Sequence, residues 1–291
     1  MEKKKKILKK SDFGHFFVKN VPSKSNLAKY YKSKYFNINP RYFKKSKDYE
    51  EKYFEYTSKI RFEFLKSNLI NKSKPTLLDI GVGTGRFLFY TKNYVRKSVG
   101  IDYSVDQISY KFGKKTKLIG LNPVEFLKSN NLKFDIITLN NVVEHSDNVN
   151  ELFDLLSKKV SKKTLILICL PNDFSTLQKY LFKNKFVKSK YWIAYPDHLQ
   201  YFNSENFVKF LIDRKFKIVD AIGDYPVETL LLNSHFNYTN KKLNIGKSVH
   251  ELRCNFIKFI YENSNMANII EFFRSCYKLK IGRNNYFIIK K

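Results

Sequence analysis

The sequence predicts an α/β fold, a parallel sheet with helices on both faces, from three observations. Short apolar runs alternate along the chain with segments whose apolar residues recur at helical spacing. The run at 76–80 breaks at a turn with three glycines in five residues, 81–85, where the backbone can turn tightly and a ligand can approach. The next run ends in Asp102, an acid placed to hold the hydroxyls of a ribose. Together they predict a nucleoside-binding βαβ unit, and the alternative is a tight turn without a ligand.

The chain begins with a basic, aromatic N-terminal extension, residues 1–45. We expect residues 1–25 to be loose because they are rich in lysine. Residues 26–45 carry many aromatic side chains, which cover either a pocket or a neighbouring core. The core unit then spans 46–222, and its first helical pattern, 47–72, leads into the first strand.

Seven apolar runs predict the strands of the sheet, at 76–80, 97–102, 117–121, 134–139, 164–170, 216–222 and 285–289. Helical patterns between them lie near 85–94, 104–112, 148–159 and 204–214. Residues 223–284 form an insertion before the last strand, 285–291, with helices near 247–262 and 266–279. We interpret this insertion as a helical cap over the substrate mouth, with a dimerisation surface as the alternative.

Composition limits the class of protein. With 291 residues, 43% hydrophobic and 16% aromatic, the chain can bury a substantial core. It has no apolar stretch of ~18 residues that would span a membrane, and its charged start is not followed by the apolar segment of a secretory signal. Three widely spaced cysteines, Cys169, Cys254 and Cys276, fit a reducing cytoplasm and predict neither a disulfide framework nor a zinc site.

The formal charge of +29 suggests nucleic acid as a partner, yet the distribution argues against it. Only 8 of the 55 basic residues are arginine, the residue that favours bidentate phosphate and base recognition. Lysines are scattered through every segment rather than gathered in one stripe. The charge is therefore expected to attract anionic surfaces or anionic sugars rather than to mark a nucleic-acid interface.

The glycine turn resembles motif I of the class I S-adenosylmethionine (SAM)-dependent methyltransferases. The spacing Asp79, Gly81, Gly83, Gly85 matches that motif, while Arg86 stands where a dinucleotide fingerprint needs its third glycine. The resemblance implies a Rossmann-like, seven-stranded, mostly parallel sheet with an antiparallel last strand. It also implies that the glycine turn lies against the methionine part of SAM.

Further cofactor contacts follow from the same resemblance. Asp102 is expected to hold the ribose, with Tyr103 beside it. Asn122 matches the position that contacts the adenine amino group in many members, although Asn-Pro is also a common turn signal.

The segment 134–148 resembles motif IV of the small-molecule branch that includes the ubiquinone O-methyltransferases. In that branch the position of Asn140 touches the methionine end of the cofactor, and the pair at Glu144 and His145 faces the substrate. His145 has the intrinsic pKa of a general base, and Glu144 would orient it or help to place a divalent ion. The alternative is a helix-start histidine bonded to backbone. Those enzymes carry a second acid where this chain has Asn141, so we predict no metal.

Residues 191–211 resemble the Pro-x-His-Leu-x-x-Phe element of methyltransferases encoded in surface-polysaccharide and lipid-sugar gene clusters. His198 is thus a second candidate base, or a residue that merely ties its loop. Trp192 and Tyr195 suit stacking on a sugar or planar ring. After the fifth strand, Asn172 lines the pocket or forms a simple turn.

The sequence therefore predicts a cytoplasmic SAM-dependent methyltransferase. Its expected acceptor is an oxygen of a small molecule, such as a nucleotide- or lipid-linked sugar of polysaccharide biosynthesis, and a homodimer is expected. The rival predictions are an RNA methyltransferase, favoured by charge alone, and a SAM-binding subunit without turnover.

Overall fold

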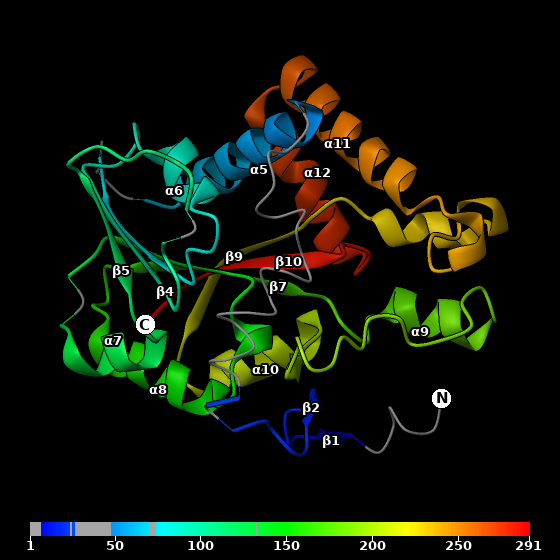
Figure 1. Ribbon diagram of the computed structural model, residues 1–291, viewed down its shortest axis with the longest axis horizontal. Helices are drawn as coiled ribbons and strands as arrows, with labels where there is room; N and C mark the ends of the chain where they lie inside the picture. Colours follow the sequence, from blue (N-terminus) through cyan, green and yellow to red (C-terminus); the bar gives the residue numbers. More distant parts are fainter. Residues whose placement is uncertain (1–6, 24, 27–47, 70–73, 107, 132) are drawn as a thin grey trace.

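The computed structural model describes residues 7–23, 25–26, 48–69, 74–106, 108–131 and 133–291. Nearly all of the aromatic segment 26–45 lies outside the described residues. The described part is built around one seven-stranded sheet (Figure 1).

The sheet has the strand order β5-β4-β3-β6-β7-β10-β9. The first five strands in this order pair in parallel with one another, and β10 pairs antiparallel with both β7 and β9. The predicted Rossmann-like, mostly parallel α/β fold is therefore confirmed. The strands are β3 (Thr76–Ile80), β4 (Lys97–Asp102), β5 (Thr116–Gly120), β6 (Ile136–Asn140), β7 (Leu165–Pro171), β9 (Lys217–Gly223) and β10 (Asn284–Lys290).

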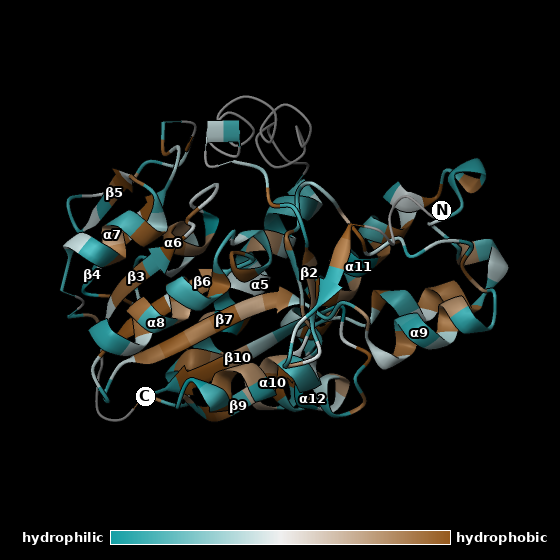
Figure 2. Cartoon of the chain, turned by 90° about the horizontal axis from the view of Figure 1, so that it is seen from below, coloured by the Kyte–Doolittle hydropathy of each residue, from teal (hydrophilic) through white to brown (hydrophobic). Residues whose placement is uncertain are grey.

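Helices cover both faces of the sheet (Figure 1). Successive strand residues point to opposite faces, so Leu77 joins one buried cluster and Leu78 the other. Helices α7 (Pro123–Ser129), α8 (Val149–Lys159) and α10 (Ser204–Asp213) pack on the Leu78 face. The Leu77 face is covered by α5 (Asp48–Lys66), α6 (Arg86–Thr91), α11 (Gly246–Asn263) and α12 (Met266–Lys278). The central strands β7 and β10 are hydrophobic along much of their length (Figure 2).

The helix predicted near 104–112 is wrong for the described residues of that segment, which form bends and turns. Its apolar side chains Val105, Ile108 and Phe112 are partly buried without a helix. An added Cβ on Gly85 would lie 2.9 Å from Ile108 Cγ2 and 3.1 Å from Phe112 Cζ, so these side chains pack directly on the glycine turn. Tyr110 donates a hydrogen bond to Glu51 of α5. The apolar residues of this segment therefore recur because they contact the glycine turn and α5, and not because they form one face of a helix.

Residues 1–25 are not loose throughout, which corrects the prediction for that segment. Strands β1 (Leu8–Lys10) and β2 (Phe16–Val18) form a hairpin, and β2 pairs with β8 (Gln200–Tyr201). His15, between the two strands, is buried and stacks on Phe202 with ring centroids 3.9 Å apart. The hairpin therefore rests against the segment that carries His198.

The insertion before the last strand contains both predicted helices. Helix α12 packs along β9 and α11 packs on α5, so they cover the sheet itself. Between β9 and α11 run three short 3-10 helices, η3 (Val227–Leu232), η4 (Ser234–Phe236) and η5 (Lys241–Leu243). Leu231 and Tyr238 of this stretch pack beside α9 (Thr176–Lys183). Among the described helices, none combines the length and the apolarity needed to cross a bilayer.

Candidate functional site

The glycine turn between β3 and α6 has the conformation that its sequence predicts. Gly81, Gly83 and Gly85 all have positive φ, at 72°, 53° and 80°. A side chain on Gly81 would collide with Val142, so only glycine fits there. The amide of Gly81 donates to the carbonyl of Ile101 at 2.8 Å, which fastens the turn to the end of β4.

Asp102, at the end of β4, lies against this turn. Its Oδ2 accepts a hydrogen bond from the Gly83 amide at 2.9 Å. Burial raises the pKa of Asp102, while backbone hydrogen bonds from Gly83, Ser104 and Tyr103 oppose that rise. A direct hydrogen bond thus connects the glycine turn with Asp102, the residue predicted to hold the ribose.

Asp79 is placed differently, inside the sheet, with 1% of its surface exposed. Its Oδ1 accepts hydrogen bonds from Thr138 Oγ1 at 2.5 Å and from Asn140 Nδ2 at 3.3 Å. Burial raises the pKa of Asp79 to about 7. Asp79 therefore links β3 to β6, and it reaches the cofactor region through Asn140. The Oδ1 atom of Asn140 is buried and has no hydrogen-bond partner among the described residues.

Tyr103 and Asn122 lie together at the ends of β4 and β5. The Asn122 amide donates to the Tyr103 hydroxyl, and the Asn122 Oδ1 accepts from the Val124 amide at 2.7 Å. Asn122 is therefore the N-cap of α7, as its turn interpretation predicts. Tyr103 is 36% exposed beside it.

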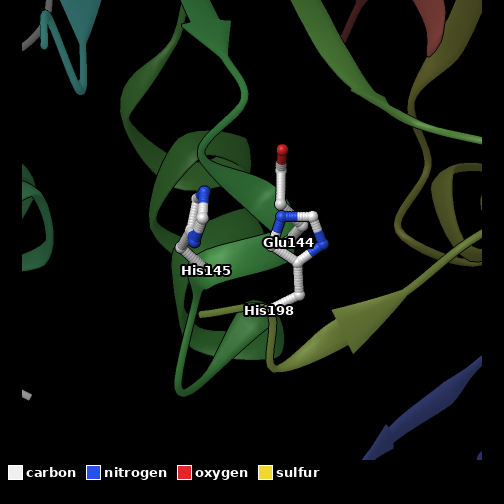
Figure 3. Close-up of side chains that lie close together, drawn as sticks. All are labelled: Glu144, His145 and His198. Carbon is white, nitrogen blue, oxygen red and sulfur yellow. The ribbon is translucent and has the colours of Figure 1, made fainter. Parts of the chain in front are cut away.

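Beyond β6, the 3-10 helix η2 (Val143–His145) carries the predicted Glu-His pair (Figure 3). His145 Nδ1 lies 2.7 Å from the backbone carbonyl of Asp197. A carbonyl only accepts hydrogen bonds, so Nδ1 carries a proton. Glu144 is 2% exposed, and its Oε1 accepts a hydrogen bond from Asn141 Nδ2 at 2.9 Å. Its Oε2 has no hydrogen-bond partner in the part of the chain that the structure describes. Burial raises the pKa of Glu144.

His198 comes from the segment before β8 and meets His145 edge to face. Their ring centroids are 5.0 Å apart and their planes lie at 85°. The Leu199 amide donates to the Glu144 carbonyl at 2.7 Å, which fastens the two segments together. Burial, with the nearby charges of His145 and Arg283, lowers the pKa of His198 to about 3. The neutral imidazole of His198 is therefore a weak proton acceptor.

Glu144, His145 and His198 also form a group whose ligand atoms all lie within 4.8 Å of one another. The group contains a single carboxylate. Asn141, at the position of the second acid in the ubiquinone enzymes, donates its amide to Glu144. One carboxylate and no second acid present a weak oxygen set for a hard divalent ion.

The predicted substrate-side residues separate into buried and open ones. Trp192 is 2% exposed. It makes edge-to-face contacts with Phe174 and Tyr191, whose ring centroids lie 5.6 and 5.2 Å from its own. Asn172 is 1% exposed; it donates to the Gly282 carbonyl at 3.1 Å and accepts from the Ser204 amide at 3.2 Å. Both side chains support the site from within. Tyr195, 41% exposed, is open to a ligand.

The site also contains charged residues that the sequence interpretation missed. Asp173, 1% exposed, accepts from Arg283 Nη1 at 3.0 Å, and Arg283 Nε lies 3.5 Å from Glu228 Oε1. These residues come from strand ends and a 3-10 helix that are far apart in the chain, so no local spacing joins them. The available signal was an acid directly after the fifth predicted strand and an arginine just before the last one.

Comparison with known proteins agrees with this architecture. The structure resembles a SAM dependent methyltransferase from Archaeoglobus fulgidus, at 22% identity and a TM-score of 0.54, over 88% of this chain and 100% of that one. A Burkholderia thailandensis 1,6-didemethyltoxoflavin-N1-methyltransferase aligns at 13% identity and a TM-score of 0.49, over 74% of this chain and 90% of that one. No curated protein matches the sequence.

The sequence itself matches a family described as a methyltransferase domain over residues 49–221. The match begins in α5, includes the glycine turn and both histidine segments, and ends in β9. Because it covers well over half of the chain, the protein belongs to this methyltransferase-domain family.

Proposed function

We propose that the protein is a SAM-dependent methyltransferase that methylates an oxygen of a small molecule. The observation that carries the proposal is the hydrogen bond between the glycine turn and Asp102, beside a buried Asn140 Oδ1 to which no described residue donates. An N–H or O–H donor is what such an oxygen needs, and an amino group is one such donor. SAM supplies an amino group of that kind, together with the sulfonium methyl to be transferred.

In this proposal each cofactor-side residue has one role. Asp102 holds the ribose hydroxyls, the glycine turn lies along the methionine part, and Asn140 Oδ1 accepts from the amino group. Tyr103, exposed next to the α7 N-cap Asn122, lies on the adenine side. Asp79 acts through Asn140, whose amide it fixes.

The general base is His145. Its Nδ1 donates to the Asp197 carbonyl, so Nε2 is the ring nitrogen that would take the proton of the acceptor hydroxyl. His198 is not the general base in this proposal, because its lowered pKa makes it a poor proton acceptor. Glu144 lies near both rings, and in its ionised form it favours the positive charge that His145 gains.

We propose an activated sugar as the acceptor, in a cytoplasmic enzyme. Support comes from the element around His198, which resembles that of the polysaccharide-cluster enzymes, and from Tyr195, whose exposed ring is available for stacking. Residues 46–222 with 285–291 are the SAM-binding core. Within the insertion 223–284, η3 adjoins the site because Glu228 contacts Arg283.

We further propose that the protein forms a homodimer through α11 and α12. Leu252, Phe259 and Phe272 on these helices are 40%, 62% and 39% exposed. Apolar side chains gathered on one surface are a feature of subunit interfaces.

Calorimetry with SAM tests the cofactor site. Asp102→Ala is expected to weaken SAM binding about 10- to 100-fold, since charge-assisted hydrogen bonds contribute about 1.5–3 kcal/mol. Asp106→Ala, at an exposed carboxylate four residues on, is the matched control. Unchanged affinity in Asp102→Ala would refute the assignment.

Labelled SAM with a panel of nucleotide- and lipid-linked sugars tests the reaction. Methylated sugar supports the proposal. Label in RNA, with binding that weakens steeply as salt rises, would support the RNA alternative instead. Binding of SAM without transfer to any acceptor class would favour the non-catalytic alternative.

A further inference from the structure

A buried chain of charged and polar groups leads from Glu228 through Arg283 and Asp173 toward His198. Arg283 contacts two carboxylates, Asp173 at 3.0 Å and Glu228 at 3.5 Å. Glu228, 1% exposed, also accepts from Gln178 Nε2 at 2.9 Å and from the Tyr191 hydroxyl at 2.7 Å. Arg283 is thus fixed between two acids, and it in turn fixes the Oδ1 of Asp173.

The other oxygen of Asp173 faces His198. Asp173 Oδ2 and His198 Nδ1 are 3.9 Å apart, and within the described part of the chain neither atom has a hydrogen-bond partner. Leaving two buried polar atoms unpaired is costly, and small side-chain rotations would bring them into hydrogen-bond range.

The backbone on both sides holds this pair in place. The His198 amide donates to the Ala194 carbonyl at 2.8 Å, and its carbonyl accepts from the Tyr201 hydroxyl at 2.9 Å. The Asp173 amide donates to the Phe202 carbonyl at 2.7 Å. Only the two side chains need to move for the bond to form.

We propose that Asp173 is a positioning residue, which accepts a hydrogen bond from His198 Nδ1 and so leaves Nε2 unprotonated to receive one from the acceptor hydroxyl. The role of Nε2 rests on the proposed function. The tautomer itself does not, since it follows from the two facing atoms. Together with His145, the pair gives the site two imidazoles whose Nε2 atoms both accept hydrogen bonds.

The groups around His198 agree with this assignment. Arg283 is protonated at every ordinary pH, so it favours the charged form of Asp173, although burial raises the pKa of that carboxyl to about 7. His145 and Glu144 face His198 from η2. Well above pH 7, Asp173 is a carboxylate, which can only accept hydrogen bonds. Once protonated, it would donate to Nδ1 and reverse the tautomer.

Long-range ¹H–¹⁵N spectra of the imidazoles test the proposal on the full chain well above pH 7. The chain has five histidines, and loss of one set of signals in His198→Gln assigns His198. The expected wild-type spectrum shows His198 neutral, with the proton on Nδ1. A proton on Nε2 would overturn the proposal from wild-type protein alone.

Asp173→Asn provides the matched change. Arg283 would hold the amide oxygen and turn the amide nitrogen toward His198, where it can only donate. His198 is then expected to switch to the Nε2-protonated tautomer, as when an amide replaces the acid behind a catalytic histidine. Asp220→Asn, at the distant pair with Arg274, is the control and should leave the His198 signals unchanged. An unchanged tautomer in folded Asp173→Asn would also overturn the proposal.

SAM affinity separates this inference from the proposed function. Asp173→Asn should retain wild-type SAM binding while losing methyl transfer by 10-fold or more, on the order of one removed hydrogen bond to a charged group. The expected tautomer switch without methyl transfer to any sugar would defeat the proposed acceptor but not the positioning role. Methyl transfer to a sugar by a variant whose tautomer is unchanged would defeat the positioning role but not the proposed acceptor.

Discussion

Asp79 and Asp102 end neighbouring strands, yet their environments give them different roles. Asp102 remains half-buried beside the Gly83 amide, where a ligand can reach it. Asp79 is enclosed and bonded to Thr138 and Asn140. A carboxyl buried without a cation as its direct partner favours its neutral form. Asp79 therefore has a structural role in the sheet, whereas Asp102 is available to bind a ligand.

The raised pKa of Asp79 predicts a stability effect of definite sign. Its folded pKa, about 7, exceeds the ordinary 3.8, so the folded state binds the proton more tightly. Relative to Asp79→Asn, wild-type stability is expected to fall as pH rises from about 4 to about 7, by up to about 4 kcal/mol. Urea unfolding of both proteins across that range measures it. Asp106→Asn controls for the charge change, and a pH-independent difference would contradict the prediction.

His145 gives the second residue-scale prediction. His145→Ala is expected to lower kcat by about 10²- to 10⁴-fold, the usual contribution of a general base, with SAM affinity unchanged. Turnover of a sugar acceptor and calorimetry with SAM measure the two effects. His235→Ala, at an exposed histidine, is the control. Full turnover in His145→Ala would remove the base role.

At the scale of elements, the small sheet β1-β2-β8 supports the segment that presents His198. The Val18 amide donates to the Leu199 carbonyl at 2.9 Å, one residue beyond that histidine. Burial lowers the pKa of His15 to about 4; a hydrogen bond with Gln200 opposes the shift and the charge of Arg214 adds to it. The hairpin is therefore attached to the site through a histidine that must stay neutral.

Acid is expected to loosen this hairpin before the main sheet. Because the folded pKa of His15 lies below the ordinary 6.5, its stabilising contribution is complete above about 6.5 and is lost as pH falls toward 4. The protection factors of the Val18 and Lys19 amides, which correct hydrogen exchange for its intrinsic slowing in acid, should fall over that range. His15→Phe keeps a ring against Phe202 and should remove this fall. An equal fall in the protection factors of His15→Phe would argue against His15 as the cause.

On the scale of the whole molecule, charge is unevenly distributed. The chain carries +29 overall, whereas several acids lie at or near the carboxyl edge of the sheet, namely Asp79, Asp102, Glu144, Asp173 and Glu228, of which Asp173 and Glu228 contact Arg283. This edge suits a cationic cofactor and repels phosphate. The arrangement argues against RNA phosphates at the reacting centre, while surface lysines remain available to anionic parts of an acceptor.

The exposed apolar surface of α11 and α12 gives the whole-molecule prediction. If two copies meet there, light scattering should report a dimer for wild type and a monomer for Phe259→Glu, because a buried unpaired charge opposes association. Ile212→Glu is the control, since Ile212 is 61% exposed on α10, on the other face of the sheet. A wild-type monomer at high concentration would refute the dimer.

By itself, the sequence determined the α/β class, the positions of all seven strands of the main sheet, and the glycine turn with Asp102. These features depend on local chemistry, namely apolar periodicity, positive φ at glycine and the acid that ends a strand. Only the tertiary structure decided that Trp192 and Asn172 are buried, that His145 meets His198, and that Arg283 reaches Asp173 across 110 residues of chain. Such contacts arise where separate strand ends meet, and no local spacing encodes which side chains face one another there.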